Sequence, residues 1–131
     1  MFIVTLFFTF LTPTYASDYQ TLIVQKMNQD RAKQGRSPIQ LDAGLSSLAQ
    51  VRAVETTQVF AHSRPNQKPW HTVFADKGLK TAYAGENIAK KSFAYEVGTD
   101  KLASVFFELW KNSEGHYQNM MKEEHRYVGI A

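Results

Sequence analysis

The sequence predicts a single α+β domain in which helices dominate and a small sheet plays a minor part. The chain has 131 residues, 44% of them hydrophobic, and a chain of this size buries one core. Three long segments repeat apolar residues at the spacing of an α-helix. Only two short segments have the composition of strands.

The first predicted helix begins after Asp18. Gly35, followed by Ser37 and Pro38, ends it, because proline cannot continue a helix and glycine favours the turn that closes one. Its apolar face consists of Tyr19, Leu22, Ile23 and Met27. This face is expected to pack against the core.

The second predicted helix follows Asp42, a natural N-cap. Its helical repeat continues until Ser63, Arg64 and Pro65 interrupt it. The apolar positions are Leu45, Leu48, Ala49, Ala53, Thr56, Val59 and Phe60. On the polar face, Arg52 and Glu55 lie one turn apart and could form a surface ion pair of little energetic weight.

The rest of the chain contains one more long helix and two short ones. A short helix is expected from Thr72 to Lys77, before Gly78, and Ser113 is expected to cap another that contains His116. Between them, Thr99 or Asp100 caps the long helix. Its apolar stripe consists of Leu102, Val105, Phe106, Leu109 and Trp110.

Strand character is confined to two segments. Residues 126–131, "RYVGIA", have it clearly, and residues 86–93, "ENIAKKSF", have it weakly. The sheet is therefore expected to be small.

The amino terminus resembles an export signal. Residues 2–11 are apolar, Pro13 follows, and Thr14 and Ala16 are small residues at the positions that a signal peptidase reads. The apolar run is too short for a membrane span, although a signal usually begins with Lys or Arg, which are missing here. We predict a signal peptide at residues 1–16, cleaved after Ala16, and a secreted domain at 17–131 that is not an integral membrane protein.

Composition limits the functions that the domain can have. The formal net charge is +3, and the longest basic run is Lys90 and Lys91. Nucleic-acid binders gather their basic residues on one surface, so we expect no nucleic-acid partner. The chain has no cysteine, which excludes disulfides and a thiolate nucleophile. Any metal site must therefore use His, Asp and Glu.

Three polar residues interrupt the apolar pattern at the ends of predicted elements. His62 follows the second helix, Glu86 follows Gly85, and His116 follows Gly115. Glycine permits a close approach that a side chain would block. Two imidazoles and a carboxylate, with water as fourth ligand, suit Zn²⁺. Each histidine could instead be hydrogen-bonded within the fold, and Glu86 could simply hold its own loop.

Four motifs in order resemble those of one known family. They are "LAQVRAVETTQVFAHSRPNQKPWHTVF" at residues 48–74, "AGENIA" at 84–89, "LWKNSEGHYQNMM" at 109–121 and "YVGIA" at 127–131. Together they are similar to the signatures of the CAP superfamily, also called SCP, in its bacterial secreted branch. The resemblance covers nearly all of the chain from Tyr19 onward.

The resemblance implies an α-β-α sandwich, an extracellular location and a cleft lined by two histidines and acidic residues. His62, Glu86 and His116 match three of the four cleft positions. At the fourth, many members have glutamate and this chain has Ser113, which can accept a hydrogen bond but is not a general base by itself. Family domains also continue beyond the "VGIG"-like strand, so the small antiparallel sheet is expected to lack strands at its C-terminal end.

Three classes of function follow. The first is a secreted binding module whose cleft holds either a divalent metal or a small lipid or peptide. In this module His62 and His116 would bind the metal, and Glu86 and Ser113 would contribute to the cleft. The second is an extracellular zinc-dependent hydrolase of peptides. The third is a structural surface domain. We favour the first, because the fourth carboxylate and the G-x-S-x-G motif are both absent from the sequence.

Overall fold

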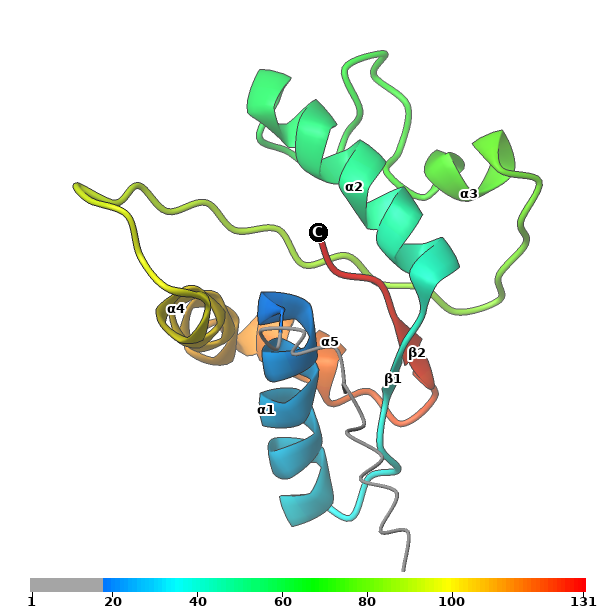
Figure 1. The fold of residues 1–131 in the computed structure, drawn as a ribbon. Coiled ribbons are helices and arrows are strands. Elements are labelled where there is room, and N and C mark those ends of the chain that lie inside the picture. Colours follow the sequence, from blue (N-terminus) through cyan, green and yellow to red (C-terminus); the bar gives the residue numbers. More distant parts are fainter. Residues whose placement is uncertain (1–17) are drawn as a thin grey trace, which may run out of the picture.

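The computed structural model describes residues 18–131 and contains five helices and two short strands in that range (Figure 1). The predicted signal peptide at 1–16 lies outside the described residues. The elements are α1 (Tyr19–Lys33), β1 (Gln40–Leu41), α2 (Ala43–Gln58), α3 (Thr72–Asp76), α4 (Thr99–Lys111), α5 (Glu114–Met120) and β2 (Tyr127–Val128). The predicted helices are therefore all present.

The helices lie on both sides of the strands. Figure 1 shows α2 and α3 on one side and α1, α4 and α5 on the other, with the two strands between them. Within each group the helices are in contact, α1 with α4, α4 with α5, and α2 with α3. This arrangement confirms the predicted α+β fold with a helical layer on each side of a small sheet.

The α1 helix forms as its sequence predicts. Asp18 caps it by accepting a hydrogen bond of 2.9 Å from the backbone N–H of Thr21. After the last turn, Gly35 has a φ of +66°, a conformation that glycine adopts without steric cost. The apolar face packs against α4 and α5 in one buried cluster. Its members are Ile23, Val24, Met27, Ile39, Ala103, Phe107, Met120, Met121 and Ile130.

The two strands pair in parallel, whereas the sequence led us to expect an antiparallel sheet. Gln40 lies opposite Tyr127 and Leu41 opposite Val128. The chain between β1 and β2 includes four helices, and a connection of that length lets both strands run in the same direction. Residues 86–93, for which a weak strand was predicted, form no strand.

The α2 helix begins where predicted and ends earlier. Asp42 accepts a hydrogen bond of 2.7 Å from the backbone N–H of Leu45. The helix stops at Gln58, so Val59 is extended and both Val59 and Phe60 are exposed rather than on the core face. At the other end, a Cβ on Gly129 would lie 2.1 Å from the carbonyl carbon of Leu45. Glycine thus lets the chain after β2 cross the first turn of α2.

Candidate functional site

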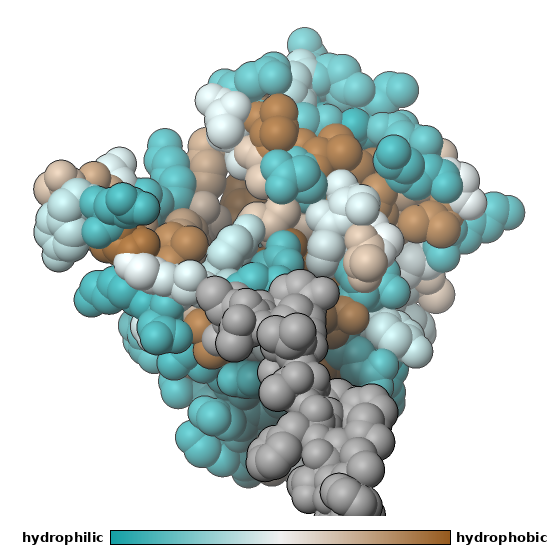
Figure 2. Space-filling model, viewed as in Figure 1, coloured by the Kyte–Doolittle hydropathy of each residue, from teal (hydrophilic) through white to brown (hydrophobic). Residues whose placement is uncertain are grey.

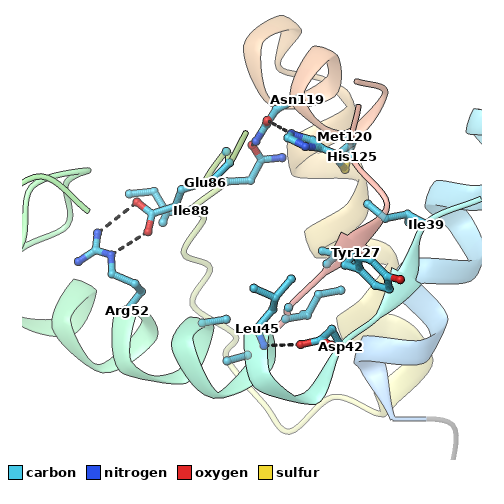
Figure 3. A pocket seen from close by; sticks show the side chains of 18 of the residues that line it. Ile39, Asp42, Leu45, Arg52, Glu86, Ile88, Asn119, Met120, His125 and Tyr127 are labelled. Atoms are coloured by element: carbon cyan, nitrogen blue, oxygen red, sulfur yellow. Dashed lines mark hydrogen bonds and ion pairs between the residues drawn. The ribbon is translucent and has the colours of Figure 1, made fainter. Parts of the chain in front are cut away.

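An open cavity of about 910 Å³ lies beside α2 (Figure 3). Leu45, Ala49 and Ala53 line it from α2, and Phe106 and Trp110 line it from α4. The rest of the wall comes mainly from α1, α3 and α5, from residues 79–81 and 83–89, and from the chain around β2. On the face of the molecule that Figure 2 shows, apolar side chains gather over the part that includes α2. Most of the lining is apolar, and some of its polar side chains form two hydrogen-bonded clusters.

The first cluster is centred on Arg52, which is only 5% exposed. Its guanidinium donates to both oxygens of Glu86, from Nε to Oε2 at 2.7 Å and from Nη2 to Oε1 at 3.2 Å. It also donates from Nη1 to Glu55 Oε2 at 2.6 Å. The interpretation of Arg52 and Glu55 as a surface pair is therefore wrong, because Glu86, far along the chain, closes over the arginine.

Arg64 extends this cluster away from the cavity. It donates from Nη2 to Glu55 Oε1 at 2.7 Å and from Nη1 to Asp76 Oδ2 at 2.7 Å. The hydrogen bond from Arg64, followed by that from Arg52, lowers the pKa of Glu55 against the cost of its burial. Glu86 in turn raises the pKa of Arg52. The carboxylates at this end of the cavity are thus neutralised by buried guanidinium groups.

His62 lies at the outer side of the same cluster. Its Nδ1 is 2.9 Å from Glu86 Oε1, while its side chain is 55% exposed. A carboxylate can only accept, so Nδ1 of His62 donates in this pair. The structure thus brings together two of the predicted site residues, His62 and Glu86.

Among residues 18–131, no side-chain hydrogen bond or ion pair joins His116 or Ser113 to that pair. His116 is half-buried on α5, and its backbone carbonyl accepts a hydrogen bond of 3.0 Å from Asn87 Nδ2. Ser113 is at the N-cap position of α5, but its side chain makes no capping bond. Residues 18–131 contain no group of three or more His, Asp or Glu that could hold a metal ion. The expected set of His62, Glu86 and His116 as three ligands is therefore not assembled.

The second polar cluster is a chain of side-chain amides that ends at a histidine (Figure 3). Asn119 Nδ2 donates to Asn87 Oδ1 at 2.9 Å, and His125 Nε2 lies 3.2 Å from Asn119 Oδ1. A Cβ on Gly85 would lie 1.9 Å from Asn119 Oδ1, so glycine is required there for the amide to approach. At Gly115, by contrast, a Cβ would meet nothing within 4 Å. The predicted role of glycine is thus confirmed at Gly85 and wrong at Gly115.

Sequence reasoning missed Arg64 and His125. His125 belongs to none of the motifs and lies in the loop between α5 and β2, where it lines the cavity. Burial, and then Lys122 and Arg31, lower its pKa. Arg64 was treated only as part of a helix-breaking tripeptide, since nothing local shows that it reaches Glu55 and Asp76.

Comparison with known proteins agrees with this fold and these motifs. The sequence matches the profile described as CAP, the cysteine-rich secretory protein family, over residues 24–131. The chain belongs to the CAP family. It is 29% identical over 121 residues to the uncharacterized protein YkwD of Bacillus subtilis (strain 168), covering 91% of this chain and 44% of that protein.

A solved structure supports the same fold. An extracellular protein containing a SCP domain from Bacillus anthracis str. Ames superposes with a TM-score of 0.69 at 22% identity, over 86% of this chain and 37% of that one. This CAP chain therefore spans less than half the length of either relative. Among residues 18–131, no helix combines the length and apolar character needed to cross a membrane.

Proposed function

We propose that this CAP domain is an extracellular binding module whose cavity holds a small, largely apolar ligand, such as a single-chain lipid, without chemical turnover. The observation that carries the proposal is the cavity itself, which has a volume of about 910 Å³. Sites for small molecules are usually concave and mostly apolar, with a few polar groups that fix the orientation of the ligand. The cavity beside α2 has this mostly apolar composition, with two hydrogen-bonded polar clusters in its wall.

The contacts of the acidic side chains favour binding over hydrolysis. A general base needs a carboxylate that can take a proton from water within hydrogen-bond distance. Both oxygens of Glu86 accept from Arg52, and both oxygens of Glu55 accept from buried arginines. If the domain were instead a hydrolase, Glu86→Gln would abolish turnover of a peptide substrate, and that result would replace the binding proposal.

Filling the cavity tests this function. Ala53 lines the cavity from α2 and is partly exposed, so Ala53→Trp places a large side chain in the binding space. Val54, its neighbour, is 53% exposed and does not line the cavity, so Val54→Trp is the matched control. We expect a fluorescent apolar probe, anilinonaphthalene sulfonate, to bind the wild type and Val54→Trp alike and to be displaced by a single-chain lipid. Ala53→Trp should bind it at least about tenfold more weakly.

Two results would overturn this proposal. One is a folded wild type that binds neither probe nor lipid, and the other is equal binding by Ala53→Trp. Displacement by an apolar peptide but not by lipid would keep the binding function and change its ligand class.

A divalent metal is a second candidate ligand, favoured by the geometry of His62. Histidines that bind metals commonly donate their other ring N–H to a carboxylate, as His62 does to Glu86. The proposed ligands are His62 and His116, with Glu86 orienting the first. Zinc titration by calorimetry should show one site at neutral pH, lost in His62→Ala, in His116→Ala and near about pH 5, where imidazoles protonate. A folded wild type without binding would remove the metal from the proposal.

A further inference from the structure

The amide chain at the cavity wall fixes which nitrogen of His125 carries the proton. The backbone carbonyl of His116 can only accept, so Asn87 must present Nδ2 to it and turn Oδ1 towards Asn119. Asn119 must then present Nδ2 to Asn87, which leaves its Oδ1 facing His125. That oxygen needs a donor, so the proton of neutral His125 is on Nε2.

The other nitrogen, Nδ1, is left with a free lone pair. No group in residues 18–131 bonds to it, and it is not enclosed by those residues. His125 lines the cavity, and Figure 3 shows it beside Asn119 and Met120. The backbone of His125 is also held, because fully buried Arg31 donates from Nη2 to its carbonyl at 3.1 Å. The backbone of His125 and the Nε2 atom of its ring are therefore both held in place.

Burial, and then the positive charges around His125, lower the pKa of its ring and keep it neutral. Lys122 of the same loop and Arg31 of α1 both disfavour a positive imidazole, and Glu124 opposes them more weakly. Burial acts in the same direction as the two cations and lowers the pKa of His125. At neutral pH the ring is thus an uncharged acceptor with a fixed orientation.

We propose that Nδ1 of His125 is the hydrogen-bond acceptor for the head group of the cavity ligand, so that the cavity selects an apolar molecule with one hydroxyl or amide N–H donor over an isosteric molecule without a donor. This inference rests on the proposed function, and it names the feature of the ligand that the site recognises. The apolar wall binds the hydrocarbon part of either molecule. Only the molecule with a donor can form a hydrogen bond to Nδ1. When the molecule without a donor fills the cavity, Nδ1 loses its hydrogen bond to water and gains none in exchange.

A matched pair of ligands tests this selection. Dodecanol and methyl undecyl ether have the same number of heavy atoms, and only the alcohol donates a hydrogen bond. In displacement of anilinonaphthalene sulfonate from the wild type at neutral pH, we expect the alcohol to bind about tenfold more tightly than the ether. In His125→Phe, which keeps a flat ring and removes the acceptor, the preference should disappear. His71→Phe is the control, because His71 is exposed and does not line the cavity.

A second measurement needs no variant. The ¹⁵N shifts of His125 in the neutral wild type should be those of an unprotonated Nδ1 and a protonated Nε2. The alcohol preference should also fall as the pH is lowered through the protonation of His125, below the ordinary histidine range.

The possible failures can be told apart. If alcohol and ether bind the wild type equally, or if Nδ1 carries the proton, this inference is overturned and the binding proposal stands. If neither molecule binds to a folded wild type, the binding proposal is overturned and this inference with it.

Discussion

The two sides of the molecule are stabilised in different ways. On the side of α1, α4 and α5, nine buried apolar residues pack into one cluster, and Asp30 and Arg31 of α1 are buried as well. On the side of α2 and α3 the buried residues are two apolar side chains, Leu48 and Val73, and two arginines, Arg52 and Arg64. No residue of α2 belongs to the apolar cluster. The second side therefore depends on charge pairing, and the open cavity lies between the two.

This difference between the two sides explains how the cavity is kept open. An apolar core contracts to exclude voids, because close packing is favourable at every point of contact. An ion-pair cluster instead holds groups at fixed distances and resists collapse around them. The α2 side can therefore leave an apolar cavity wall next to a rigid frame.

The largest effect is expected from a change in the apolar cluster. Phe107 is 4% exposed and packs within that cluster. Phe107→Ala should lower the free energy of unfolding by about 4 kcal/mol, because it removes buried carbon and leaves a void. Urea unfolding followed by circular dichroism measures this. Leu109→Ala on the same helix, at 40% exposure, is the control and should cost far less.

A change at the centre of the ion-pair cluster should have the next largest effect. Arg52→Met keeps much of the side-chain volume and leaves Glu55 and Glu86 without their shared cation. We expect a loss of about 3 kcal/mol in the same urea experiment. Lys33→Met, which removes an exposed partner of Asp30, is the control and should cost little. A loss no greater than that of the control would show that the α2 side does not depend on Arg52.

A smaller effect is expected where the chain approaches the amide cluster. Gly85→Ala places a Cβ against Asn119 and should displace the amide, at a cost of about 2 kcal/mol. Gly115→Ala is the matched control, because its Cβ meets nothing and alanine favours the helix. It should leave the stability unchanged or raise it slightly. Equal stabilities of the two variants would contradict the role assigned to Gly85.

The smallest effect is expected in the dependence of folding stability on pH. Arg64 and then Arg52 lower the pKa of Glu55 below its usual value of 4.5 in the folded state. The stability that Glu55 contributes is therefore complete above pH 4.5 and is lost as the pH falls through the folded pKa. In Glu55→Gln the free energy of unfolding should decrease less steeply as the pH is lowered. A decrease should remain, because Lys111 also lowers the pKa of Asp30 in α1. An unchanged slope in Glu55→Gln would refute this assignment.

The helices could be predicted from the sequence and the sheet could not. The apolar period locates α1, α2 and α4, and Asp18 and Asp42 cap α1 and α2 as their residue type predicts. The predicted cap of α4 at Thr99 or Asp100 is wrong, because Gly98 occupies the N-cap position and no side chain caps this helix. β1 has two residues, too few to show an alternation. Its parallel pairing with β2 depends on the path of the whole chain between them, which no local pattern contains.

The candidate site was partly predictable for the same reason. The link between His62 and Glu86 was expected, since both residues belong to recognisable motifs. The burial of Arg52 was not expected, because its spacing from Glu55 is the same in a surface pair and in a buried one. The ion pair with Glu86, which covers Arg52, distinguishes the two cases. His125 had no local signal at all, and only the contacts of Asn87 and Asn119 show its role.

The crossing of Gly129 over the first turn of α2 has a consequence for the order of folding. The pairing of Gln40 with Tyr127 and the bond from Ile130 N–H to Ser46 Oγ join residues that lie far apart in the described chain. Neither contact can form until residues 127–130 have left the ribosome, although α1 and α2 are made early. Contacts between residues so far apart in the sequence slow folding. They also leave the helices that are synthesised first without their packing partners during synthesis.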